Sequence, residues 1–220
     1  MVLKIIKYNA GNIQSVLTAL ERLGVQAEVT DDIEKIQSAD KVIFPGVGEA
    51  SSAMRSLQQN NLDAVIKNLK QPVLGICVGM QLLCSHSEEN NTNCLNIVPV
   101  QVKKFPQAPL SPALGGTREG SSGVRLKVPQ VGWNTIYNLQ SDLFAGIEPD
   151  SYIYNVHSYY AEDSTYTIAT CNYGVEYAAA IKKDNFYGVQ FHTEKSAEIG
   201  DRIIKNFLEL PLSPAWGGKT

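Results

Sequence analysis

Short apolar runs alternate with helical patterns through the first half of the chain, and this alternation constrains the fold more than any other feature. Residues 3–8, 41–44 and 73–76 are apolar runs of strand length. Between them, apolar residues over 13–23 recur at the spacing of one helical face, and helical stretches are predicted to fill 50–69. Strands that alternate with helices form parallel sheets, because each helix crosses back over the sheet. The sequence therefore predicts an α/β fold with an open, largely parallel central sheet flanked by helices.

The second half of the chain is dominated by strand patterns. We predict strands over residues 152–157, 167–171, 177–181 and 186–191. A closing helix is predicted over 199–208. The length of 220 residues suits one domain, which we expect to span residues 1–210.

Two segments rich in Pro, Gly and Ser resemble each other. The sequence of residues 109–116 is nearly repeated at 211–218, and neither segment has enough apolar residues to build a core. We interpret residues 107–123 as a loop insertion and residues 211–220 as a tail.

Composition excludes several classes of function. The net charge is −3 and the basic residues are scattered, so we expect neither nucleic acid nor a membrane as a partner. No apolar run approaches the ~18 residues of a membrane span. The four cysteines form no CxxC pair, which predicts neither a metal site nor disulfides and suits the reducing cytoplasm. No cofactor is indicated.

The pattern Gly75-Ile76-Cys77-Val78-Gly79 lies between an apolar strand and a helix. A nucleophile on so tight a turn has a strained backbone and needs small neighbours. The start of the following helix favours a thiolate, and the Val78 N–H would lie near a forming oxyanion. A lone cysteine is more often a buried apolar residue, but the flanking glycines and the strand-to-helix junction favour a nucleophile here.

A thiolate enzyme needs an imidazole and a group that orients it, and His192 with Glu194 supplies both. On an extended segment residues two positions apart point the same way, so the Glu194 carboxylate would reach the His192 ring. His86 would lie on the helix leading away from Cys77, too far along its axis. His157 also follows a strand and is not excluded by spacing, but it lacks an acidic residue two positions away.

Several separated motifs together resemble the class I (triad) glutamine amidotransferases, and within them the glutaminase subunits of imidazole glycerol phosphate synthases. The resemblance covers about residues 2–210 without the insertion. It is carried by Gly75-Ile76-Cys77-Val78-Gly79-Met80-Gln81-Leu82-Leu83, Gln190-Phe191-His192-Thr193-Glu194-Lys195-Ser196, Gly11-Asn12-Ile13-Gln14-Ser15, Pro45-Gly46-Val47-Gly48, Ser87-Glu88-Glu89, Val128-Pro129-Gln130-Val131-Gly132-Trp133-Asn134 and Val156-His157-Ser158-Tyr159.

The resemblance implies a flavodoxin-like fold and hydrolysis of L-glutamine to glutamate and ammonia. Cys77 would form a glutamyl thioester, His192 would shuttle the proton, and Glu194 would orient His192. Ammonia would pass to a (β/α)₈-barrel cyclase subunit that makes imidazole glycerol phosphate and aminoimidazole carboxamide ribotide for histidine synthesis. The other implied residues form an oxyanion hole (Val47, Gly48, Val78), a glutamine pocket (Gln81, Glu89, His157, Ser158, Tyr159) and a partner interface (Asn12, Trp133, Lys195).

The chain departs from the family pattern at three positions. Thr193 replaces a usual proline, Gln130 a usual histidine and Asn155 a usual aromatic residue. These departures leave open a paralogous glutaminase that supplies ammonia for sugar amination in surface polysaccharide synthesis. A non-catalytic scaffold subunit would be expected to lack a residue of the Cys77, His192 and Glu194 set, and none is lost.

Overall fold

The computed structural model describes residues 1–8, 13–106 and 126–212. The predicted insertion at 107–123, most of the predicted tail at 211–220, and Asn12 lie outside the described residues. The boundaries that we expect for the domain therefore stay predictions.

Eleven strands among the described residues form the central sheet. Five of them pair in parallel in the order β2-β1-β3-β4-β13. Strands β1, β3 and β4 come from the alternating pattern of the first half, and β13 lies within the strand predicted over 186–191. Their bounds are β1 Leu3–Ile6, β2 Glu28–Thr30, β3 Lys41–Phe44, β4 Val73–Ile76 and β13 Phe186–Val189. Strands β3, β4 and β13 are buried along their whole length, as expected for parallel strands covered on both faces.

The sheet continues from β13 through mostly antiparallel pairs in the order β12-β10-β7-β5-β6, with β11 pairing β12. These strands are β5 His86–Ser87, β6 Thr92–Asn93, β7 Gln101–Lys104, β10 Tyr159–Ala161, β11 Thr167–Asn172 and β12 Glu176–Lys183. A separate two-stranded sheet joins β8 Gln130–Ile136 to β9 Ser151–His157.

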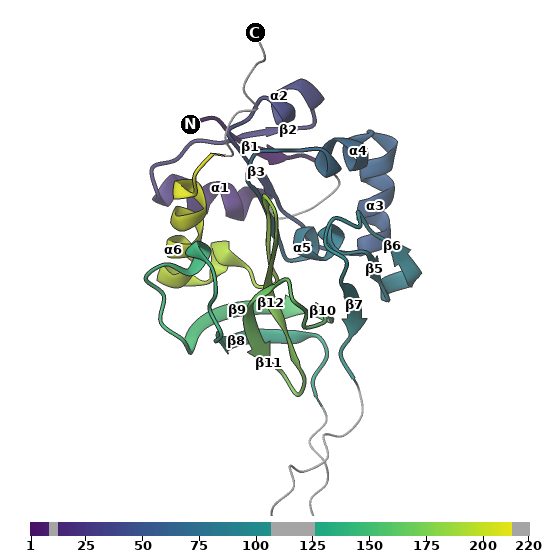
Figure 1. The fold of residues 1–220 in the computed structure, drawn as a ribbon, viewed down its shortest axis with the longest axis vertical. Helices are drawn as coiled ribbons and strands as arrows, with labels where there is room; N and C mark the ends of the chain where they lie inside the picture. Colours follow the sequence, from purple (N-terminus) through teal and green to yellow (C-terminus); the bar gives the residue numbers. More distant parts are fainter. Residues whose placement is uncertain (9–12, 107–125, 213–220) are drawn as a thin grey trace, which may run out of the picture.

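Helices cover both faces of the parallel part of the sheet (Figure 1). Helices α1 Ile13–Arg22 and α6 Ala197–Glu209 lie on one side, and α3 Ala50–Gln59, α4 Leu62–Lys67 and α5 Val78–Leu83 on the other. Helix α2 Ile33–Gln37 lies near the outer strand β2, and three short 3₁₀ helices complete the described elements: η1 Glu89–Asn91, η2 Asp142–Phe144 and η3 Thr193–Lys195.

The helical stretches expected over residues 50–69 are the helices α3 and α4, which Asn61 separates with a left-handed φ of 55°. Two expectations about local structure are wrong. His86 does not lie on the helix that follows Cys77, since α5 ends at Leu83 and His86 begins its own strand. The strand predicted over 186–191 ends at Val189.

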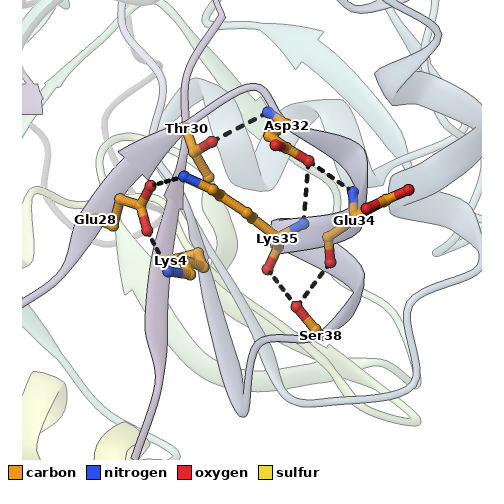
Figure 2. Close-up of polar contacts among 7 residues, drawn as sticks. All are labelled: Lys4, Glu28, Thr30, Asp32, Glu34, Lys35 and Ser38. Atoms are coloured by element: carbon orange, nitrogen blue, oxygen red, sulfur yellow. Dashed lines mark hydrogen bonds and ion pairs between the residues drawn. The ribbon is translucent and has the colours of Figure 1, made fainter.

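Charged side chains on and beside the outer parallel strand β2 form a hydrogen-bonded cluster (Figure 2). Glu28 on this strand accepts hydrogen bonds from Lys35 of α2 and Lys4 of β1, which lower the pKa of the Glu28 carboxyl to about 2. Asp32 caps α2 by accepting from the backbone N–H groups of Glu34 at 3.0 Å and Lys35 at 3.2 Å. Charges on an edge strand oppose pairing with a second chain.

Helix α6 packs against η3 through a glycine. A Cβ atom placed on Gly200 would lie 1.8 Å from the backbone oxygen of Thr193. We therefore expect Gly200→Ala to lower the free energy of unfolding by about 1–3 kcal/mol, although alanine favours helix. Urea unfolding would measure this loss. The control Lys205→Ala, at an exposed position of the same helix, should change stability little, and a Gly200→Ala protein as stable as wild type would contradict the close packing.

Candidate active site

Two adjacent parallel strands bring the predicted nucleophile and imidazole together. Ile76 at the end of β4 pairs with Val189 at the end of β13, and the Cys77 N–H donates to the Val189 carbonyl at 2.8 Å. The two strands run in the same direction, so the residues that follow them emerge at the same edge of the sheet. Cys77 and His192 consequently line one cavity.

Cys77 lies on a strained strand-to-helix turn. Its φ of 55° and ψ of −112° fall outside the regions that L-residues favour, and it is the N-cap residue of α5. Gly79 makes this turn feasible, because a Cβ there would lie 1.9 Å from the Phe44 carbonyl oxygen at the end of β3. Gly75 of β4 is also close to this turn, since a Cβ there would lie 2.9 Å from the Gly79 backbone, so the small neighbours expected from the sequence permit α5 to start against both β3 and β4.

The imidazole of His192 is held by Glu194. The Nδ1 atom of His192 lies 2.7 Å from Oε1 of Glu194, and both side chains are buried. The predicted reason for this contact is wrong, since residues 193–195 form the 3₁₀ helix η3 and not an extended segment. The contact is made with Thr193, and not proline, between the two residues.

The environment of His192 favours its charged form. Burial alone would lower its pKa, but hydrogen bonds with Cys77 and Glu194 and the charges of both groups outweigh burial and raise the pKa to about 10. The imidazolium is therefore the favoured form of His192 at neutral pH.

His157, which sequence spacing left open, lies in the same cavity in a different role. Its Nδ1 is 2.8 Å from the Tyr159 carbonyl oxygen and its Nε2 is 3.3 Å from the Tyr177 hydroxyl. Burial lowers the pKa of His157 to about 4, so its ring is neutral at neutral pH. Both ring nitrogens are engaged away from Cys77, whereas His192 contacts it.

The cavity has a volume of about 320 Å³. It brings together residues from six separate stretches of the chain, including all those expected from the sequence for the oxyanion hole and for the glutamine pocket. These residues are Val47, Gly48, Val78, Gln81, Glu89, His157, Ser158 and Tyr159.

Glu89 and Gln81 both line this cavity, and each is held by a hydrogen bond to the backbone of another segment. Glu89 accepts a hydrogen bond from the Ala50 N–H at 2.7 Å, and burial raises the pKa of its carboxyl. Gln81 is buried and donates from its amide nitrogen to the Tyr159 carbonyl at 3.0 Å. The cavity therefore offers an acidic side chain and an amide oxygen to a polar ligand.

Of the three residues expected at a partner interface, the structure describes two. Trp133 is 53% exposed on β8 and packs edge-on against Tyr154 with ring centroids 5.6 Å apart. Lys195 is exposed and lines the cavity. Asn12 lies outside the described residues.

The other thiols and the remaining histidine lie away from this chemistry. Cys84, Cys94 and Cys171 are free and buried. His86 bonds through its ring to Asn91 at 2.9 Å and does not line the cavity. Within residues 1–8, 13–106 and 126–212, no group of three or more His, Cys, Asp or Glu residues could hold a metal ion.

Sequence reasoning missed residues that position the site. The Ser196 hydroxyl donates to the His192 carbonyl at 2.7 Å and accepts from the Tyr154 N–H at 2.9 Å, which joins the η3 turn to β9. The Tyr8 hydroxyl donates to the Pro45 carbonyl at 2.5 Å, beside the segment that carries Val47. No spacing rule predicts the contacts of Tyr8 and Ser196. The one available signal was that Ser196 lies four positions after His192, close enough along the chain for its hydroxyl to reach the His192 carbonyl.

A family model described as glutamine amidotransferase class-I matches residues 4–210. The chain belongs to the class-I glutamine amidotransferases. It is 54% identical over 210 residues to a protein of Bacteroides fragilis named imidazole glycerol phosphate synthase subunit HisH, covering 96% of this chain and 100% of that protein. A protein of the same name from Pasteurella multocida is 45% identical over 206 residues, covering 93% and 96%.

Solved structures of glutamine amidotransferases share this fold. One has a TM-score of 0.68 at 14% identity and covers 95% of this chain and 98% of its own. A second, from Thermotoga maritima, has a TM-score of 0.59 at 14% identity and covers 94% and 82%. At this identity the likeness concerns the fold alone. No helix of this amidotransferase, within the ranges that the structure describes, is long and apolar enough to cross a membrane.

The amidotransferase should tolerate proline at Thr193. His192 has φ −84° and ψ 99°, which suits a residue before proline, and Thr193 begins a 3₁₀ helix. The buried Thr193 hydroxyl has no hydrogen-bond partner. We expect Thr193→Pro to raise the free energy of unfolding by about 1 kcal/mol, measured by urea unfolding.

Thr193→Val is the matched control, because it removes the hydroxyl and leaves the backbone free. The proline variant should be more stable than the valine variant. A proline variant less stable than wild type would show that the backbone of η3 does not accept the ring.

Proposed function

We propose that this chain is the glutaminase subunit of an imidazole glycerol phosphate synthase. It hydrolyses L-glutamine to glutamate and ammonia, with Cys77, His192 and Glu194 as the catalytic residues. The observation that carries this proposal is the contact of His192 with both Cys77 and Glu194 in one cavity at the carboxyl edge of the sheet.

The geometry supports a thioester mechanism. The Cys77 thiolate attacks the carboxamide carbon, and the negative charge moves to the carboxamide oxygen. Backbone N–H groups of Val78 and of the Val47–Gly48 segment would hold this oxyanion. The His192 imidazolium then gives its proton to the departing nitrogen, which leaves as ammonia when the C–N bond breaks. Water, deprotonated by His192, attacks the thioester, and breaking of the C–S bond releases glutamate and regenerates the thiolate.

The α-amino and α-carboxylate groups of glutamine would be bound by cavity residues other than the catalytic three. The carboxylate of Glu89 and the side-chain oxygen of Gln81 are acceptors suited to the α-ammonium group of glutamine. Ser158 and Tyr159 complete the wall on that side.

The named relatives support the histidine pathway over sugar amination. Proteins that match 93–96% of this chain at 45–54% identity bear the name of one subunit of imidazole glycerol phosphate synthase. Ammonia released here would pass to a (β/α)₈-barrel cyclase subunit that forms imidazole glycerol phosphate and aminoimidazole carboxamide ribotide. The unpaired thiols suit a cytoplasmic location.

An apolar face beside the cavity supports a partner subunit. Val131 and Trp133 of β8, with Tyr152 and Val156 of β9, are 37–62% exposed. Val131 pairs with Val156, whose carbonyl oxygen lies 3.9 Å from the sulfur of Cys77. This face, the β8–β9 face, therefore begins at the nucleophile and suits a subunit that receives the product.

Cys77→Ala should abolish glutamine hydrolysis, because no other thiolate can replace the nucleophile. Synthesis from added ammonia by the complex with the cyclase should survive, since ammonia bypasses this site. Both activities would be measured on the same complex. Cys84→Ala is the matched control, at a buried thiol outside the cavity, and should retain hydrolysis. Hydrolysis by the Cys77→Ala complex would exclude the assigned nucleophile.

Trp133→Ala should weaken binding to the cyclase about tenfold or more, because exposed aromatic residues dominate interface energies. Titration calorimetry would measure the affinity. Ile33→Ala, at a 36%-exposed apolar residue of α2 away from the β8–β9 face, should leave it unchanged. Equal affinity of wild type and Trp133→Ala would place the interface elsewhere.

A further inference from the structure

We propose that Gln190 is a further catalytic residue, whose side-chain amide donates a hydrogen bond to the sulfur of Cys77 and favours the thiolate. This inference rests on the proposed function. Gln190 is fully buried and directly follows β13. Its Nε2 atom lies 3.7 Å from Sγ of Cys77, a distance that an N–H···S hydrogen bond spans because sulfur is larger than oxygen.

The direction of the Gln190 amide follows from its neighbours. The backbone carbonyl of Tyr159 can only accept, so the side chain of Gln81 must place its amide nitrogen there, at 3.0 Å. The same nitrogen lies 2.9 Å from the side-chain amide of Gln190 and uses its second hydrogen in that contact. Gln190 must therefore present its oxygen to Gln81. This leaves its NH₂ group, a donor, facing the sulfur.

A second set of contacts fixes the Tyr159 carbonyl, on which the orientation of Gln81 and Gln190 depends. His157 donates from Nδ1 to the Tyr159 carbonyl at 2.8 Å, because a backbone oxygen cannot donate. The carbonyl thus receives hydrogen bonds from both His157 and Gln81. The other ring nitrogen of His157 faces the Tyr177 hydroxyl at 3.3 Å. The chain of contacts from Tyr177 to Cys77 is buried, which makes each member's orientation costly to reverse.

Gln190 is also fixed through its backbone. Its N–H donates to the Ala179 carbonyl of β12 at 2.8 Å, and the preceding Val189 carbonyl accepts from the Cys77 N–H. The donor to the sulfur is therefore in place before any substrate binds. A donor fixed in advance stabilises charge without reorganisation, and a hydrogen bond to a charged acceptor is stronger than one to a neutral acceptor.

Other groups around Cys77 can also influence its ionisation. His192, three residues after β13, contacts the sulfur, and Tyr8, two residues after β1, interacts with Cys77 electrostatically. Glu89, His157 and Lys195 line the same cavity. None of these groups is changed in a variant of Gln190, so the comparison of variants isolates the amide.

The test is the rate at which iodoacetamide alkylates Cys77 in the full chain, followed by mass spectrometry from about pH 5 to about pH 10. Gln190→Glu keeps the acceptor for Gln81 but replaces the donor to sulfur by a carboxylate oxygen. Gln190→Leu removes both hydrogen bonds. We expect the midpoint of the rate profile to move upward by about one pH unit in Gln190→Leu and further in Gln190→Glu. The kcat for glutamine in the complex should fall at neutral pH and recover toward alkaline pH.

Gln71→Leu is the matched control, because it breaks a glutamine-to-carbonyl hydrogen bond of 2.8 Å to Ile36, outside the cavity. It should leave the alkylation midpoint unchanged. Circular dichroism would establish that each variant is folded. Folded Gln190→Glu and Gln190→Leu proteins with the wild-type midpoint would overturn the proposal, even if both melt at lower temperature. Alkylation needs no glutaminase activity, so this failure is distinguishable from hydrolysis by Cys77→Ala, which would refute the proposed function.

Discussion

The parallel pairing of β4 with β13 is the interaction on which the site depends. The Cys77 N–H bonds to the Val189 carbonyl, so the two strands end in register at one edge of the sheet. Cys77 and His192 are far apart in the chain, and only this pairing places them in one cavity. Backbone hydrogen bonds alone do not fix the register of two strands, because every residue can form them. The apolar side chains of β4 and β13 fix it, because they are buried along the whole length of both strands.

Close backbone contacts at two glycines, Gly79 and Gly200, position the segments that carry the catalytic residues. Gly79 lets α5 start against the end of β3, which forces the strained turn at Cys77. Gly200 lets α6 pack on η3, the turn that follows His192 and carries Glu194. The strain at Cys77 is maintained because the surrounding strands and helices are fixed by the core. A side chain larger than hydrogen at either glycine would push a catalytic segment out of place.

The environment of the cavity separates two histidines into different roles. Burial lowers the pKa of His157, which stays neutral and serves as a donor to the Tyr159 carbonyl. His192 is also buried, but its contacts with Cys77 and Glu194 reverse the effect and raise its pKa. Two identical side chains thus differ in charge, because only His192 contacts the acidic groups of Cys77 and Glu194. The apolar β8–β9 face beginning at Val156 adds a surface from which a partner could reach this chemistry.

The amino-acid sequence by itself determined the parallel sheet, the turn at Cys77 and the candidate imidazole at His192, because local periodicity and short motifs report on strands, helices and tight turns. It also indicated the family, since several motifs occur in order. The sequence could not determine that residues 193–195 form a helical turn, that β8 pairs with β9, or that Gln190 faces the sulfur. Those features arise from contacts between segments distant in the chain, which no local pattern encodes. The tertiary structure decided them by bringing those segments into contact, so that most buried polar groups met a hydrogen-bond partner.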